Sequence, residues 1–235
     1  MTDSRRIVFL YLKNYVQAEV LDMIDEHRPA SFSVEAVEQS AAPEVRGAAI
    51  ANADYILGYP GDLSQAELDS AANLKLLQLL SAGFEHVDLD AFAERTIPVA
   101  NNGGANAPTV AEHTIMLILS VLRELPLHHN ALREGNWLGT DETFNMRELH
   151  GKTLGIVGFG KIGQQVARVS GGFNTTNFYY DAVRANPAME AELHVKFLPL
   201  DELLARADVV TIHTALNEGT EGLFNARTIA LMKSS

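Results

Sequence analysis

The residues of this sequence best suited to binding a ligand lie in a glycine-rich turn. The turn joins an apolar segment to a helical segment. The segment 158–163 (Gly-Phe-Gly-Lys-Ile-Gly) follows the apolar run 153–157 and opens a helical pattern, and a second apolar run, 178–180, ends in Asp181. Glycines placed this way let the backbone approach a pyrophosphate at a helix N-terminus, and the acid binds a ribose diol. The pattern predicts a dinucleotide site, with a plain turn of an α/β fold as the alternative.

Side chains around this turn indicate which dinucleotide it would bind. Asp181 is expected to hold the adenosine ribose, and its charge repels a 2′-phosphate, which favours NAD over NADP. Arg184 lies nearby and leaves NADP open, with a surface arginine of no such role as the other interpretation. The residues predicted to cradle the pyrophosphate are Gly158, Gly160, Lys161, Ile162 and Gly163.

Strands and helices that would position the turn alternate along the chain. Alternation of this kind implies parallel sheets covered on both faces, and a polar, glycine-rich break at 101–108 divides the chain. Ser64 and Glu67 have the spacing of a capping box, and Asp88 is expected to cap a further helix. The predicted strands are 7–10, 55–58, 74–79, 97–100, 153–157, 178–180, 195–197 and 208–212, and the predicted helices include 16–24 and 109–122.

Composition excludes several function classes. The 235 residues carry a net charge of −12 without a Lys/Arg cluster, so we expect no nucleic-acid partner. The absence of cysteine excludes disulfides and thiolate metal sites and suits a cytoplasmic setting. His128 and His129 have no partner pattern for a metal, and no apolar run reaches membrane-spanning length, so we expect neither metal nor membrane binding.

Further motifs follow one another along the chain, at 80–88, 99–106, 110–113, 151–158, 200–204, 207–210 and 231–233. In this order they resemble the motifs of the D-isomer-specific 2-hydroxyacid dehydrogenases. The resemblance implies an α/β fold of two Rossmann-like, doubly wound parallel-sheet domains with a cleft between them. Residues 1–101 would form a flavodoxin-like substrate domain, and 102–235 an incomplete NAD-binding domain. The reaction implied is hydride transfer between NAD and a small 2-oxo or 2-hydroxy acid, with formate, phosphite and phosphoglycerate left open as substrates.

The resemblance also implies roles for residues before the glycine turn. Ala82 and Gly83 would present N–H groups to the substrate carboxylate, although an ordinary strand-to-helix turn is the alternative. Asn106 would face substrate and nicotinamide, and Thr109 would begin the helix beneath the nicotinamide. That helix, 109–122, would pair two subunits. Its stretch 114–122 is apolar nearly all round, so we expect it to be buried on several sides, in a dimer or in the core of a monomer.

Beyond the turn, the resemblance implies that His213, Thr214 and Ala215 line the adenosine pocket. The segment follows a predicted strand, and open α/β sheets bind ligands at the carboxyl ends of their strands. A buried, hydrogen-bonded His213 without a chemical role is an equal alternative.

The sequence departs from the family at its end. The family's catalytic arginine, glutamate and histidine lie beyond the motif found here at Met232 and Lys233, which Ser234 and Ser235 follow. We therefore assign no catalytic residue, because ketone reduction needs a proton donor and a cationic clamp. We expect a truncated dehydrogenase with impaired turnover, and the alternative is a non-catalytic NAD(H)-binding interaction or regulatory protein.

Overall fold

A computed structural model describes residues 4–14, 18–139 and 146–234 of the chain. The chain divides into two compact units, Met1–Gly103 (unit 1) and Gly104–Ser235 (unit 2). None of the helices in the described residues is long and apolar enough to cross a membrane.

Unit 1 is a five-stranded parallel sheet with helices in the strand connections. The strand order is β2-β1-β3-β4-β5, the order of the flavodoxin-like fold. The core lies on the three inner strands, β1, β3 and β4, where Val8, Ile56 and Leu77 are fully buried. The elements are β1 (Arg5–Tyr11), α1 (Ala18–His27), β2 (Phe32–Glu38), α2 (Pro43–Ala51), β3 (Tyr55–Gly58), α3 (Gln65–Ser70), β4 (Leu76–Leu79), α4 (Leu89–Glu94) and β5 (Val99–Ala100).

Local capping signals in unit 1 act as predicted. The Ser64 hydroxyl accepts a hydrogen bond from the Glu67 N–H at 3.3 Å, and the Glu67 carboxylate accepts one from the Ser64 N–H at 2.9 Å, which completes a capping box at the start of α3. The Asp88 carboxylate accepts a hydrogen bond from the Ala91 N–H at 3.1 Å and begins α4. Both predictions from the sequence are confirmed.

Unit 2 is a four-stranded parallel sheet with the order β8-β7-β6-β9. This is the order of the first four strands of a Rossmann fold, and the predicted α/β class with parallel sheets is confirmed. The elements are α5 (Ala107–Leu122), α6 (Leu125–Arg133), β6 (Thr153–Val157), α7 (Lys161–Ser170), the 3-10 helix η2 (Gly171–Phe173), β7 (Thr176–Tyr180), α8 (Pro187–Glu192), β8 (Val195–Phe197), α9 (Leu200–Arg206), β9 (Val209–Ile212) and α10 (Ala226–Ala230).

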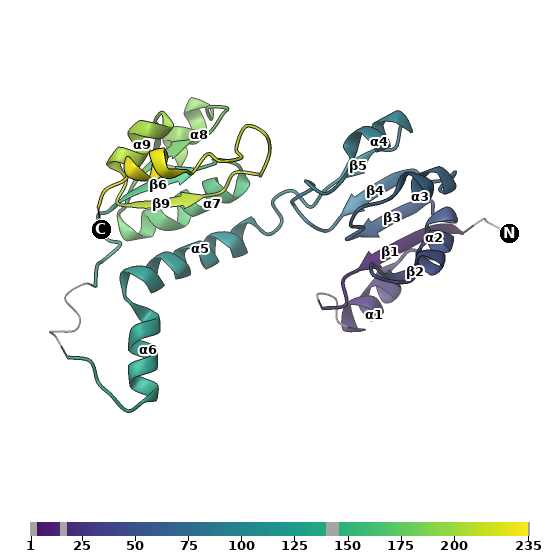
Figure 1. The fold of residues 1–235 in the computed structure, drawn as a ribbon, viewed down its shortest axis with the longest axis horizontal. Coiled ribbons are helices and arrows are strands. Elements are labelled where there is room, and N and C mark those ends of the chain that lie inside the picture. The colour runs from purple at the N-terminus through teal and green to yellow at the C-terminus, as the bar shows by residue number, and fades with distance from the viewer. Residues whose placement is uncertain (1–3, 15–17, 140–145, 235) are drawn as a thin grey trace. The chain divides into compact units, whose positions relative to one another are not determined.

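Two cores cover the two faces of this sheet. Ile156 and Tyr179 pack with Ala111 of α5 and Val166 of α7 on one face. On the other face Val157, the next residue of β6, packs with Leu203 and Leu204 of α9. Figure 1 shows α7 and α9 on these opposite sides of the sheet. The alternation of side chains along β6 thus divides them between two layers of helices.

Several predicted elements differ from the structure. The polar residues before β7 predict a short strand, but β7 begins at Thr176 because Asn177 is buried and hydrogen-bonded: its Oδ1 accepts from Thr175 Oγ1 at 2.8 Å. Strand β2 and helix α2 were not predicted. The predicted helix 16–24 begins outside the described residues and continues to His27 as α1.

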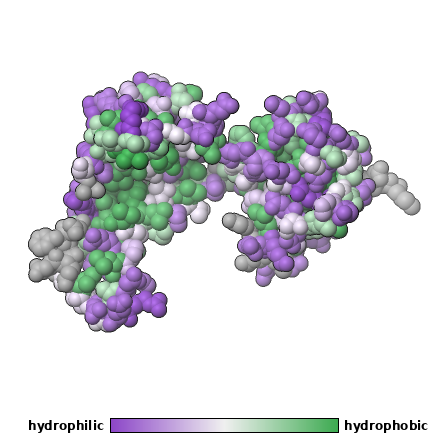
Figure 2. All heavy atoms as spheres, in the orientation of Figure 1, coloured by the Kyte–Doolittle hydropathy of each residue, from purple (hydrophilic) through white to green (hydrophobic). Residues whose placement is uncertain are grey.

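Helix α5 presents apolar side chains on the surface of the described chain. Met116 and Leu117 are each 50% exposed and Val121 is 77% exposed. The single chain therefore leaves these side chains uncovered, whereas the sequence predicts burial of the helix on several sides, in a dimer or in a monomer core. A groove of about 740 Å³ runs between α5 and β9, with Leu117 and Val121 on one wall and Val209–His213 on the other. Figure 2 shows hydrophobic residues gathered on this part of unit 2.

Candidate functional site

The glycine turn after β6 is shaped by contacts that admit no side chain at two of its three glycines. Gly158 has φ +94°, and a Cβ there would lie 2.6 Å from both the His213 carbonyl carbon and the Thr214 nitrogen. A Cβ on Gly163 would lie 2.1 Å from the Gly158 carbonyl oxygen. Gly160, by contrast, has open space around its missing side chain. The first and third glycines therefore allow the turn to fold, and the second leaves its outer side clear for a ligand.

Free N–H groups lie at this open side. Gly160 is the N-cap of α7 and receives no side-chain cap. Within the described residues, the N–H groups of Gly160, Ile162 and Gly163 donate no hydrogen bond. Unpaired N–H groups at a helix start attract an anion, since the helix dipole adds to their partial positive charge. The residues present therefore fit the pyrophosphate of a dinucleotide.

Asp181 lies directly beside the turn, at the end of β7. Its Oδ2 accepts a hydrogen bond from the Phe159 N–H at 2.6 Å, and its Oδ1 accepts one from the Val183 N–H at 3.1 Å. The Gly158 N–H donates to the Tyr180 carbonyl at 2.8 Å, which joins the turn to the same strand end. The carboxylate is thus fixed at the edge of the open space, where it can accept hydrogen bonds from a ribose diol.

The end of β9 closes the third side of the turn. The His213 N–H donates to the Val157 carbonyl at 2.7 Å, and the imidazole Nε2 lies 2.8 Å from the Thr211 hydroxyl. Burial lowers the pKa of His213 below its ordinary value of 6.5, so the ring is neutral at pH 7. Thr214 touches the turn through its backbone, and the exposed Ala215 follows in a loop.

The start of α5 lies against the start of α7. Gly104 has φ +90°, and a Cβ there would lie 2.1 Å from Cδ of Lys161, so the lysine stem occupies the place a side chain would take. Asn106 is the N-cap of α5, and both Asn106 and Thr109 are exposed on its first turn. The sequence did not predict this contact, because Lys161 lies far from Gly104 along the chain. The one local signal for it is the glycine pair at 103–104.

Unit 1 contains the loop predicted to bind the substrate carboxylate, between β4 and α4. Its backbone is held by side chains: Asn101 Nδ2 donates to the Ala82 carbonyl and Ser81 Oγ donates to the Gly83 carbonyl, each at 2.7 Å. In the described part of the chain the N–H groups of Ala82 and Gly83 donate no hydrogen bond. However, a Cβ on Gly83 would lie 2.6 Å from the Glu85 carboxylate, so an anion bound here would have to displace that acid.

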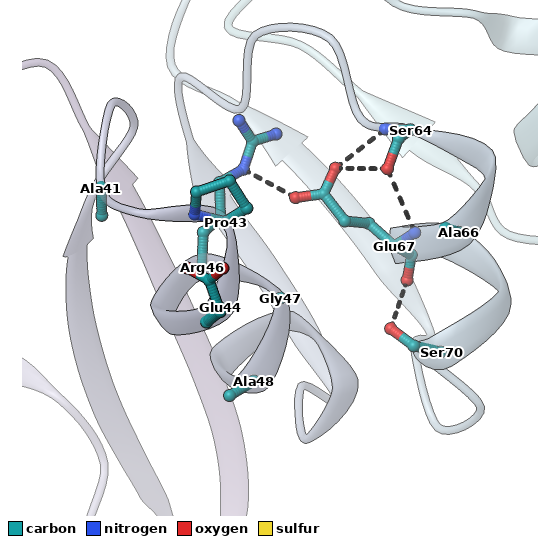
Figure 3. Close-up of a pocket in the computed structure, with 10 residues that line it drawn as sticks. All are labelled: Ala41, Pro43, Glu44, Arg46, Gly47, Ala48, Ser64, Ala66, Glu67 and Ser70. Atoms are coloured by element: carbon teal, nitrogen blue, oxygen red, sulfur yellow. Dashed lines mark hydrogen bonds and ion pairs between the residues drawn. The ribbon is translucent and has the colours of Figure 1, made fainter.

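A second hollow in unit 1, of about 640 Å³, lies between α2 and α3, and the sequence did not predict it. Figure 3 shows that three of its polar side chains are engaged with one another: Arg46 Nε lies 3.0 Å from Glu67 Oε1, and Glu67 also closes the capping box with Ser64. The Arg46 guanidinium donates to the Pro60 and Asp62 carbonyls as well, at 3.0 and 2.9 Å. The charges of Arg46 and Glu67 are therefore used in contacts within unit 1.

The structure therefore brings the glycine turn, Asp181 and the His213–Thr214 backbone to one place, at the carboxyl ends of β6, β7 and β9. Thr109 lies on the first turn of α5, and Ala215 lies in the loop after β9. Ala82 and Gly83 belong to unit 1. Across the three described ranges, no group of three His, Asp or Glu side chains is placed to hold a metal ion.

Comparison with known proteins gives this site its family. Residues 115–235 match the family model of the D-isomer specific 2-hydroxyacid dehydrogenase NAD binding domain. A formate dehydrogenase of Chaetomium thermophilum is 39% identical over 180 residues, which are 74% of this chain and 48% of that protein. A hydroxypyruvate reductase of Thermotoga maritima is 31% identical over 215 residues, which are 92% of this chain and 64% of that protein. The chain thus spans about half the length of the formate dehydrogenase.

Solved structures show the same fold. The D-lactate dehydrogenase of Aquifex aeolicus, solved with NAD and lactic acid, superposes with a TM-score of 0.82 at 28% identity, over 97% of this chain and 66% of that one. Together with the glycine turn, the free N–H groups and the placement of Asp181, these matches establish what kind of protein this is. The chain belongs to the D-isomer specific 2-hydroxyacid dehydrogenase family, and its second unit is the family's NAD-binding domain.

Proposed function

We propose that this chain is an NAD-dependent oxidoreductase that interconverts a D-2-hydroxy acid and its 2-oxo acid, with NAD bound by unit 2. The observation that carries the proposal is the arrangement of the 158–163 turn, with free N–H groups at α7 and the Asp181 carboxylate beside them. The names of relatives, a formate dehydrogenase and a hydroxypyruvate reductase, support the reaction class and leave the substrate open.

Residues of unit 2 would bind each part of the cofactor. The N–H groups of Gly160, Ile162 and Gly163 would hold the pyrophosphate, with the Lys161 ammonium adding positive charge, and Asp181 would hold the ribose. Backbone at Gly158 and the His213–Ala215 segment would line the adenosine pocket, while Asn106 and Thr109 would face the nicotinamide. When bound, the nicotinamide supplies or accepts the hydride.

We also propose that unit 1 binds the substrate carboxylate through the N–H groups of Ala82 and Gly83. Two unpaired N–H groups in a loop without side-chain bulk suit an anion, and Asn101 and Ser81 hold the carbonyls of that loop. The nearby Glu85 carboxylate opposes binding until it rotates away. The absence of cysteine suits a reducing compartment, and a cytoplasmic location stays a prediction.

Self-association of this chain is a further part of the proposal. The exposed apolar residues Met116, Leu117 and Val121 on α5 support a homodimer formed through residues 109–122. An apolar surface of this kind is commonly an interaction site, because its burial removes it from water.

A non-catalytic, NAD(H)-binding role is the second candidate, and one observation favours it. His213 is the histidine beside the glycine turn, and its lowered pKa together with its contact to Thr211 makes it a poor proton donor at pH 7. The described site is therefore equipped to bind a dinucleotide without itself supplying a proton.

The experiment is a fluorescence titration of the purified 235-residue chain with NADH, followed by assays of NADH oxidation with glyoxylate, pyruvate and hydroxypyruvate. We expect saturable NADH binding. Turnover of a 2-oxo acid would support the enzyme, and binding without turnover would support the second candidate. A chain that is folded by circular dichroism and does not bind NADH would overturn both.

A further inference from the structure

Three side chains form a hydrogen-bonded cluster that the predicted cofactor contacts do not use: Tyr179 in β7, and Arg184 and Glu190 after it. Arg184 Nε donates to Glu190 Oε1 at 2.8 Å, and Arg184 Nη2 donates to Glu190 Oε2 at 2.9 Å. This bidentate pairing occupies both carboxylate oxygens and one edge of the guanidinium. The Arg184 side chain is 62% exposed, but its guanidinium is held by the largely buried Glu190 carboxylate.

Glu190 is in turn anchored to the core. The Tyr179 hydroxyl donates to Glu190 Oε1 at 2.7 Å and accepts a hydrogen bond from the Ala185 N–H at 3.0 Å. The Tyr179 ring is fully buried and stacks on Phe159 with ring centroids 4.0 Å apart. The bonds from Arg184 and Tyr179 lower the pKa of Glu190 to about 2, so it stays charged at neutral pH. A carboxylate fixed by a buried tyrosine is a firm point of attachment for the arginine.

The position of the cluster determines where the guanidinium lies. Asp181 accepts a hydrogen bond from the Val183 N–H at 3.1 Å, which turns the chain directly after β7. The Arg184 guanidinium then lies 5.6 Å from the centroid of Phe197 in β8. In the sheet order β8-β7-β6-β9, β8 is on the other side of β7 from β6, which carries the glycine turn. The positive charge is therefore held on the side of the ribose-binding strand that faces away from the turn.

This placement bears on the choice between NAD and NADP, which differ by a phosphate on the adenosine ribose. A 2′-phosphate needs a cation beside the acid that ends β7, and Arg184 is the single Lys or Arg in the sequence from 181 to 192. We propose that Glu190, positioned by Tyr179, sequesters Arg184 and thereby strengthens the preference for NAD over NADP. The proposal rests on the assignment of the cofactor site and goes beyond it, because Glu190 is not among the residues assigned to cofactor binding.

The test is a comparison of dissociation constants for NADH and NADPH in the wild-type chain and in Glu190→Gln, by fluorescence titration. The amide removes the charge and the bidentate pairing at nearly constant shape. We expect Glu190→Gln to bind NADPH about tenfold more tightly than wild type does, which corresponds to ~1.4 kcal/mol. Its affinity for NADH should change little. Tyr179→Phe removes the hydroxyl that holds Glu190, so it should also raise the affinity for NADPH relative to NADH, by a smaller factor. This second variant tests the proposal if Glu190→Gln is poorly folded.

Two controls separate sequestration from a general change of charge. Glu192→Gln removes the same charge from the same helix, but Glu192 pairs with Arg168 of α7, at 2.7 Å, so it should leave the NADPH to NADH ratio unchanged. The double variant Arg184→Ala/Glu190→Gln should lose the gain in NADPH affinity. An unchanged ratio in Glu190→Gln, or a gain that survives in the double variant, would overturn the proposal. Failure of wild type to bind NADH would instead count against the cofactor site itself.

Discussion

At the residue scale, the three glycines of the 158–163 turn differ in what each one permits. Gly163 allows α7 to approach the Gly158 carbonyl, whereas Gly160 borders open space. A methyl group therefore has opposite consequences at the two positions, although both changes are Gly to Ala. This difference separates the folding role of the turn from its binding role.

We predict that Gly163→Ala lowers the free energy of unfolding by ~3 kcal/mol, because its Cβ would meet a backbone oxygen that cannot move without breaking the turn. Gly160→Ala should leave the unfolding free energy nearly unchanged but weaken NADH binding roughly tenfold, since the methyl enters the ligand's space. Urea unfolding and NADH titration measure the two effects. Equal stability of Gly163→Ala and wild type would contradict the assigned packing.

His213 gives a prediction for pH. Burial lowers its pKa in the folded chain, so the unfolded chain binds a proton at a higher pH than the folded chain does. The stability that the neutral, buried His213 contributes is present above the pKa of the unfolded chain, about 6.5. It is lost as the pH falls towards the lower pKa of the folded chain. Between pH 7.5 and 5.5, wild type should lose more unfolding free energy than His213→Gln in urea titrations. Parallel losses in both chains would show that His213 carries no such linkage.

At the element scale, the short helix α3 depends on its capping box. Ser64→Ala removes the acceptor for the Glu67 N–H and should lower the unfolding free energy of unit 1 by ~1 kcal/mol. Ser64→Thr keeps a hydroxyl at the N-cap and is the matched control. A urea midpoint for Ser64→Ala equal to that of the threonine variant would mean that the capping box contributes nothing to the stability of unit 1.

Elements with strong local signals were predictable from the sequence, and elements stabilised mainly by distant partners were not. The capping residues Ser64 and Asp88 and the glycines of the turn act through neighbours in the chain, so their types and spacing suffice. Strand β2 was missed because its alternating pattern is short: Phe32 and Val34 alternate with the exposed Ser33 and Glu35, but the alternation breaks at the exposed Ala36. Helix α2 contains Gly47 and several alanines, which give no clear apolar face.

The same distinction applies to the candidate site. Asp181 beside the glycine turn was predictable from a pattern within one strand-turn-helix unit, as was the strand end that carries His213. The contact between Gly104 and Lys161 joins residues far apart in the chain, and no local pattern reports it. The direction of the Arg184 side chain was equally hidden, because the sequence leaves both a phosphate and the Glu190 carboxylate as partners.

At the scale of the whole molecule, the exposed face of α5 predicts self-association. We expect light scattering at micromolar concentration to give about twice the 25.6 kDa mass of the chain. Val121→Glu should shift this towards the monomer without loss of stability, because Val121 is 77% exposed in the single chain. Ile229→Glu, at an exposed apolar residue of α10, is the control. A monomeric wild type, or dissociation by the control change alone, would count against a dimer through α5.

The central claim is that unit 2 binds NAD with the Asp181 carboxylate on the adenosine ribose. The most direct measurement is a paired titration of wild type and Asp181→Ala with NADH and with NADPH. The account predicts that wild type prefers NADH, and that the substitution weakens NADH much more than NADPH, because the lost carboxylate accepts bonds from the ribose diol and repels a 2′-phosphate. An equal loss of affinity for both dinucleotides would contradict it.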